Sequence, residues 1–84
     1  MKLVFSDEAW YDCLYWQKQD RKMVERIYKL IQEVKREPFS GLGKPEPLKQ
    51  ALSGFWSRRI TDEHRMAYRV EGDALILPQL RYHY

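Results

Sequence analysis

The chain ends in Arg81-Tyr82-His83-Tyr84, which brings a guanidinium, two phenols and an imidazole together within four residues. Imidazole is the one side chain whose unperturbed pKa, about 6.5, lies near neutrality, so a histidine can give or take a proton at physiological pH. A chain terminus usually frays and carries no particular chemistry. The residue types at this terminus instead predict an active site that the C-terminus completes.

Three further groups could complete a metal-free site that cleaves RNA together with His83. Such cleavage needs a base for the ribose 2′-OH, an acid for the departing 5′-oxygen and a cation for the phosphate. Glu46, held in an extended backbone between two prolines, could be the base, and His83 could be the acid. Arg65 offers a planar cation for the phosphate, and Tyr84 could stack on a base or bond a phosphate.

Each of these residues also has an ordinary structural explanation. A terminal histidine is more often a surface residue, a strand arginine more often pairs with a carboxylate, and a single loop acid is common. Their joint appearance around one sheet face is what favours a site. A metal nuclease fits less well, because His64 and His83 lie in different predicted strands without a carboxylate cluster. The sequence thus offers no recognisable set of metal ligands.

Composition places the chain among globular proteins, since 44% of its 84 residues are hydrophobic and 14% are aromatic. Residues 44–69 carry six Lys/Arg against three Asp/Glu, which favours an anionic partner such as RNA, although on charge alone a solvated surface is the better explanation. The single cysteine excludes an intrachain disulfide. Without a signal-peptide pattern or a membrane-spanning apolar run, the expected location is the cytoplasm, with no membrane partner.

A helical hairpin is predicted before Pro38, since the residue preceding a proline is disfavoured in a helix. Ser6 and Asp20 are suitable N-caps for its two helices. In the first helix we expect the buried stripe to be formed by Trp10, Cys13 and Leu14. In the second helix, apolar residues recur at helical spacing, at Met23, Ile27, Leu30, Ile31 and Val34.

Strands are predicted at residues 2–5, 55–61, 64–70 and 74–84. In strand 64–70, Met66, Tyr68 and Val70 alternate with Arg65, Ala67 and Arg69, so the arginines stand on the face away from the helices. Strand 55–61 has a mixed pattern, which leaves open whether Arg58 or Arg59 reaches a ligand. In the last strand, Pro78 cannot donate to a ladder and indicates a bulge, a bend or an edge position.

These elements predict an α+β fold for one small domain over residues 1–84. The helical hairpin at the N-terminus packs on one face of an antiparallel, twisted β-sheet. Beyond Pro78, the expected alternation places Arg81 and His83 on one face of the last strand and Tyr82 and Tyr84 on the other.

Four segments together closely resemble the YoeB toxins, which belong to the RelE-like superfamily of bacterial toxin–antitoxin systems. The segments are Lys44–Lys49, Leu52–Thr61, Glu63–Arg65 and Arg81–Tyr84. The resemblance implies a RelE-like fold and a ribosome-dependent mRNA endonuclease that cuts in the ribosomal A site without a metal and inhibits translation. It also implies as partners the 70S ribosome, mRNA and a cognate YefM-like antitoxin, and often a second copy of the toxin.

The resemblance also implies roles for individual residues. Glu46 corresponds to the general base, His83 to the general acid, Arg65 to the group that stabilises the phosphate in the transition state, and Tyr84 to the residue that positions the RNA. The positions that resemble supporting RNA contacts are Lys49 and Arg59, with Arg58 kept as the alternative to Arg59. The implied product carries a 2′,3′-cyclic phosphate, or its 3′-phosphate successor, and a 5′-hydroxyl. The resemblance implies no metal and no organic cofactor.

A competing hypothesis is a non-catalytic member of the same superfamily, either a toxin that blocks gyrase or a co-repressor bound to its antitoxin. Such relatives need neither a terminal imidazole nor a matching acid. Glu46 together with His83-Tyr84 therefore favours RNA cleavage. The main departure from the family pattern is the segment around Pro78, which bears on how the last strand is paired.

Overall fold

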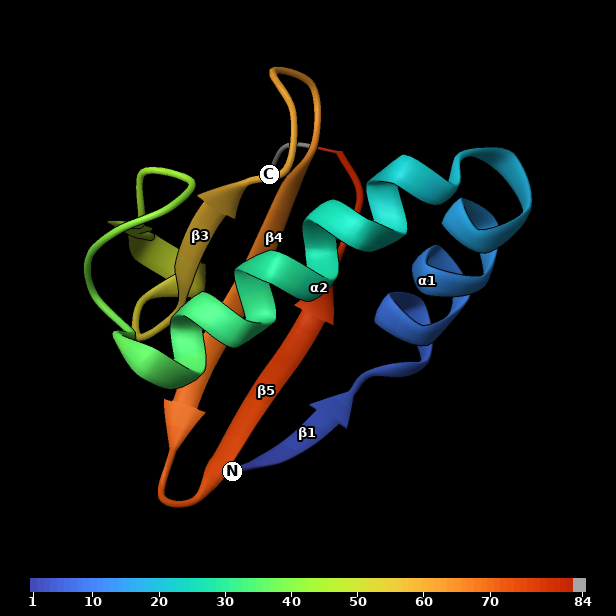
Figure 1. The fold of residues 1–84 in the computed structure, drawn as a ribbon. Helices are drawn as coiled ribbons and strands as arrows, with labels where there is room; N and C mark the ends of the chain where they lie inside the picture. Colours follow the sequence, from blue (N-terminus) through green and yellow to red (C-terminus); the bar gives the residue numbers. More distant parts are fainter. Residues whose placement is uncertain (83–84) are drawn as a thin grey trace.

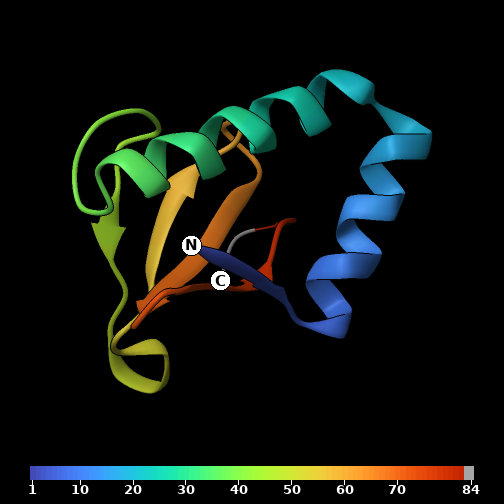
Figure 2. The same ribbon diagram turned by 60° about the horizontal axis from the view of Figure 1, so that its bottom comes forward.

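The structure, a computed structural model, describes residues 1–82. Its elements in chain order are β1 (Lys2–Phe5), α1 (Asp7–Gln19), α2 (Arg21–Arg36), β2 (Glu46–Pro47), the 3₁₀ helix η1 (Gln50–Leu52), β3 (Trp56–Arg59), β4 (Arg65–Glu71) and β5 (Ala74–Gln79). The strands form one sheet in the order β1-β5-β4-β3-β2. The helix α2 crosses one face of this sheet and α1 runs beside β5 and β1 (Figures 1 and 2). The predicted α+β fold is confirmed.

Both predicted N-caps are present. The Oγ of Ser6 accepts a hydrogen bond from the Ala9 amide at 3.0 Å, and the Oδ1 of Asp20 accepts one from the Lys22 amide at 3.1 Å. These bonds satisfy amides that have no partner inside a helix. The Ser6 hydroxyl also donates to the carbonyl of Pro78 at 2.8 Å, so the start of α1 is fixed to the end of β5.

The two helices differ in how well their buried faces were predicted. All five apolar positions of the predicted stripe on α2 are buried. On α1 the prediction was wrong for Trp10 and Leu14, which are 52% and 45% exposed, and Cys13 is only partly buried. The buried positions are instead Ala9, Asp12 and Trp16. This face contains a polar residue, because Asp12 bonds a main-chain amide of the C-terminal segment, and a pattern of apolar residues cannot detect it.

The sheet is mixed in direction. The pairs β2–β3, β3–β4 and β4–β5 are antiparallel, whereas β1 pairs with β5 in parallel, with Leu3 opposite Leu75. The partner of β1 is the last strand of the chain, so no local turn indicated the direction of this pairing. The core lies between the sheet and the helices and includes the fully buried Leu30, Val34, Met66, Tyr68, Leu75, Leu77 and Leu80.

Pro78 lies in a β-bulge, one of the three predicted alternatives. Ala67 pairs with Gln79 and Arg69 pairs with Ile76, so Tyr68 faces two residues of β5, one of which is Pro78. On the other side of β5, the pairing with β1 ends at Leu77, and the missing N–H of Pro78 deprives no neighbour of a donor. The strand ends at Gln79, earlier than predicted, and the chain leaves the sheet at residues 80–82.

The loop between α2 and β2 is fixed to the sheet through Gly43. The carbonyl of Gly43 accepts a hydrogen bond from the Arg59 amide at 2.7 Å, and its φ is +86°. A Cβ on this residue would lie 2.8 Å from Leu30 Cδ2 and 3.2 Å from the Arg59 carbonyl oxygen. Only glycine permits this close approach, which sets the path of the chain into Glu46.

We predict that Gly43→Ala destabilises the protein more than Gly72→Ala does. Both residues have positive φ, but a Cβ at Gly72 meets no atom within 4 Å. Gly72→Ala therefore costs backbone strain of about 1–2 kcal/mol. Gly43→Ala adds an overpacking cost of roughly 1–3 kcal/mol. Urea unfolding of the two variants measures the difference, and equal losses would contradict the role assigned to Gly43.

Candidate active site on the open face of the sheet

A row of side chains crosses the sheet on the face opposite α2. Glu46 of β2 is paired with Ser57 of β3, Ser57 with Ala67 of β4, and Ala67 with Gln79 of β5. Residues directly opposite each other in neighbouring strands point to the same face, so these four share one face of the sheet, on which Ser57 and Ala67 are buried. The β4 alternation predicted from sequence puts Arg65 on this face as well, two residues from Ala67.

Arg65 joins the row through its guanidinium. Its Nη1 lies 2.8 Å from Glu46 Oε1 and donates to Ser57 Oγ at 3.0 Å. The side chain of Arg65 is only 15% exposed, whereas that of Glu46 is 57% exposed. The structure thus brings two of the predicted catalytic residues into contact, with a partly buried cation beside an accessible carboxyl group.

The C-terminal segment reaches the same place. The Arg65 amide donates to the Tyr82 carbonyl at 3.1 Å, and the Tyr82 amide donates to Nδ1 of His64 at 2.9 Å. The backbone N–H and C=O of Tyr82 are therefore both hydrogen-bonded, to His64 and to Arg65, the residue whose side chain contacts Glu46. His83 and Tyr84 lie outside the described residues, so their roles stay predictions.

Arg58 is buried on the opposite face and has a structural role. It is fully buried, and its guanidinium donates to the carbonyls of Leu42 and Ser40, both at 2.9 Å, to the carbonyl of Glu37, and to the Tyr68 hydroxyl at 3.1 Å. An RNA contact by Arg58 does not fit this burial.

Tyr68 completes the buried network around that guanidinium. Its hydroxyl donates to the Pro38 carbonyl at 2.7 Å, and burial raises the pKa of this phenol, which keeps the proton on the donor. Through Arg58 and Tyr68, residues 37–42 are bonded to the sheet.

Arg59, by contrast, lies on the site's face. It is paired with Arg65 across β3 and β4, its side chain is 40% exposed, and its Nη1 lies 3.8 Å from Asp62 Oδ1. Two neighbouring guanidinium groups raise the positive potential where a phosphate would bind. Of the two arginines that the sequence left as alternatives, the side chain of Arg59 is partly exposed and that of Arg58 is fully buried.

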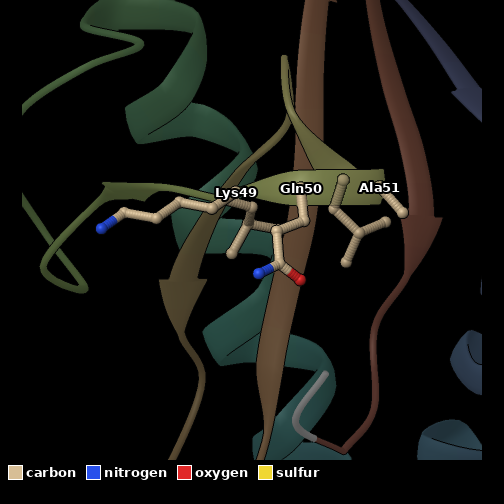
Figure 3. Close-up of a pocket in the computed structure, with 5 residues that line it drawn as sticks. Lys49, Gln50 and Ala51 are labelled. Atoms are coloured by element: carbon tan, nitrogen blue, oxygen red, sulfur yellow. The ribbon is translucent and has the colours of Figure 1, made fainter.

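Lys49 belongs to a neighbouring surface. It precedes η1 and lines a shallow pocket, where Figure 3 shows its side chain extending away from that of Gln50. The side chain is exposed and three positions along the chain from Glu46.

Sequence reasoning missed Ser57 and His64, which bond the Arg65 side chain and the Tyr82 amide. For Ser57, the only indication in the sequence was that it lies two positions before Arg59 in one strand, so that both side chains point to the same face.

Among residues 1–82, no three His, Cys, Asp or Glu side chains are grouped to hold a metal ion. Over the same residues, neither α1 nor α2 is long and apolar enough to cross a membrane.

Comparison with known proteins gives consistent matches along the chain. The family model of the YoeB-like toxin of bacterial type II toxin–antitoxin systems matches residues 5–84. The toxin YoeB of Escherichia coli (strain K12) is 57% identical over 84 residues, which are 100% of both chains. The solved YoeB/ParE toxin from Agrobacterium tumefaciens aligns with a TM-score of 0.97 at 55% identity, over 100% of both chains.

A third relative has been solved in two assemblies. YoeB from Staphylococcus aureus is known as a dimer and in a heterotetrameric YoeB–YefM toxin–antitoxin complex. It aligns at 40% identity with TM-scores of 0.95 and 0.93, over 100% of this chain and 98% of that one.

The fold and these matches define the class of the protein as a toxin of a bacterial type II toxin–antitoxin system. The match covers all but the first four residues of the chain. Within that class, the chain belongs to the YoeB family, which confirms the resemblance seen in its sequence.

We predict very different losses of stability for the adjacent substitutions Arg58→Ala and Arg59→Ala. Loss of Arg58 leaves buried carbonyls without a donor and should cost roughly 3–5 kcal/mol of unfolding free energy. Loss of the half-exposed Arg59 removes only a surface ion pair and should cost less than about 1 kcal/mol. Thermal unfolding followed by circular dichroism measures both, and similar melting temperatures would contradict the assignment.

Proposed function

We propose that this toxin is a ribosome-dependent endoribonuclease that cuts mRNA in the ribosomal A site and so inhibits translation. The observation that carries the proposal is the contact between Glu46 and Arg65, with the Tyr82 carbonyl bonded to the Arg65 amide. A carboxyl group, a guanidinium and the residue next to His83 in the chain are thereby brought to one place. A carboxyl group and a guanidinium are two of the groups that metal-free RNA cleavage needs, and the proposal assigns the third, the acid, to His83.

In the proposed reaction, Glu46 removes the proton of the ribose 2′-OH, and the oxygen attacks the adjacent phosphorus. Arg65 neutralises the charge that develops on the phosphate. A guanidinium has five N–H donors, so Arg65 can bind a phosphate and still keep its contacts to Glu46 and Ser57. His83 protonates the departing 5′-oxygen, which leaves a 2′,3′-cyclic phosphate and a 5′-hydroxyl.

RNA is held, in this proposal, by the exposed cations around the reacting groups and by the terminal aromatic residue. Arg59 contacts phosphates from the position beside Arg65, and Lys49 does so from its exposed place before η1. Tyr84 positions the nucleotide, as an aromatic ring can by stacking on a base.

The proposed partners follow from the same reaction and from the relatives. The 70S ribosome presents the mRNA, which places the protein in the cytoplasm. A YefM-like antitoxin is the expected inhibitor, since the relative from Staphylococcus aureus is known in a complex with YefM. A second copy of the chain is a further proposed partner, because that relative is also known as a dimer.

The function is tested by mapping cuts in mRNA on programmed ribosomes. The wild type should cut in the A site, whereas Glu46→Gln, His83→Gln and a chain lacking residues 83–84 should each cut about 10²–10⁴ times more slowly. Glu25→Gln, on the exposed side of α2, is the matched control and should retain wild-type activity.

Intact mRNA with the wild-type toxin would reject the nuclease function. If the same preparation inhibited DNA supercoiling by gyrase, the non-catalytic alternative within the superfamily would replace it.

Antitoxin binding should stabilise the toxin against heat. Large apolar side chains on α1 are exposed, among them Trp10, Tyr11 and Leu14, and the small domain leaves room for stabilisation by a ligand. An acidic antitoxin segment at a hundred times its Kd should add about 2.7 kcal/mol to the unfolding free energy. Differential scanning fluorimetry reads this as a higher melting temperature, and no shift at saturation would contradict the predicted partner.

A further inference from the structure

The chain just beyond β5 is held by two side chains of α1. The Leu80 amide donates to Oδ2 of Asp12 at 3.1 Å, and the Leu80 carbonyl accepts from Nε1 of Trp16 at 3.0 Å. Asp12 and Trp16 are four positions apart and so lie on one face of the helix, one turn above the other. Together they replace the two ladder bonds that Leu80 lacks outside the sheet; we call this pair the α1 clamp.

The α1 clamp is buried, with Asp12 5% exposed, Trp16 7% and Leu80 0%. A buried carboxyl group costs free energy unless it is hydrogen-bonded, and an aliphatic side chain would fill the position without that cost. An aliphatic residue could not, however, bond a main-chain amide. The two hydrogen bonds of the clamp therefore fix the direction of the backbone at Leu80, which apolar packing alone would not do.

The next two residues are also fixed. The guanidinium carbon of Arg81 lies 3.5 Å from the centroid of the Tyr15 ring and 4.5 Å from that of Tyr82. Tyr82 has a φ of +66°, an unfavourable value for a bulky residue that persists only where the surroundings determine it. Here the bonds of Tyr82 to His64 and Arg65 do so.

We propose that Asp12 and Trp16 are positioning residues for the nuclease reaction, which act through residues 80–82 to place the acid that follows them in the chain. The catalytic part rests on the proposed function. Both residues hydrogen-bond the Leu80 backbone, and the Trp16 ring also packs edge to face on His64 with ring centroids 4.8 Å apart. Their effect is large, because misplacing a catalytic group by about 1 Å can cost on the order of 10²-fold in rate.

Amide hydrogen exchange, measured by NMR on the full chain, tests the clamp itself. In Asp12→Ala, exchange of the Leu80 amide should be at least about tenfold faster, because its acceptor is gone. Asp12→Asn, whose side-chain carbonyl can still accept, should restore slow exchange. Trp16→Phe keeps a ring but loses the donor, and should also speed exchange at Leu80. Unchanged exchange at Leu80 in both Asp12→Ala and Trp16→Phe would overturn the clamp.

Single-turnover cleavage on programmed ribosomes tests the consequence for catalysis. At saturating ribosome, Asp12→Ala and Trp16→Phe should lower the cleavage rate constant by about 10–100-fold. Ribosome affinity should be unchanged, and Asp12→Asn should stay near wild type. Ile27→Val, a core change on α2, is the control for lost stability and should alter neither cleavage nor Leu80 exchange. Trp16→Phe carries the test if Asp12→Ala does not fold.

The two measurements separate this proposal from the nuclease function. Faster Leu80 exchange with undiminished cleavage would overturn the positioning role and leave the nuclease function intact. A wild type that cuts no mRNA would reject the nuclease function and the catalytic part of this proposal with it. In that case, faster Leu80 exchange in Asp12→Ala would still support the clamp as the device that fixes the C-terminal segment.

Discussion

The contacts of Arg65 are the interaction on which the site depends. The Arg65 guanidinium holds Glu46 and Ser57, and its amide holds the carbonyl of Tyr82. One residue thus joins the edge strand β2, the neighbouring strand β3 and the C-terminal segment. The side chain and the backbone of Arg65 both make these contacts. A shift of β4 would therefore move Glu46, the Arg65 guanidinium and Tyr82 together. The pairing of the strands therefore determines the relative positions of the groups in the site.

A second set of buried contacts supports the opposite face. Arg58 and Tyr68 bond the backbone of residues 37–42, and Gly43 then permits close approach to Arg59. Both devices act on the loop that leads to Glu46. The adjacent arginines of β3 therefore differ in role and exposure. Arg58 fixes the loop from inside the core, whereas Arg59 lies on the opposite face and is partly exposed.

Local patterns predicted much of the fold, and long-range pairing accounts for what they missed. The N-caps and the apolar stripe of α2 depend on neighbours in sequence, and both were predicted. In β4, Met66 and Tyr68 are buried as predicted, but Ala67 is buried as well and Val70 only partly. The buried face of α1 was not predicted, because burial of Asp12 depends on Leu80, far away in the chain. The parallel direction of β1 and the contacts of Ser57 and His64 depend likewise on register. Glu46 and Arg65 were named as candidates from the sequence, and the register of β2, β3 and β4 brings their side chains into contact.

The strand order has a consequence for how the toxin is made. The last strand, β5, lies between β1 and β4 in the sheet, and Ser6 at the start of α1 bonds the carbonyl of Pro78. The N-terminus of a nascent chain is synthesised first. The strand β1 and both helices therefore cannot pack against β5 until synthesis has passed residue 79. Such non-local pairing also slows folding. The sheet, and the site that lies on it, therefore cannot be completed until that strand has been delivered.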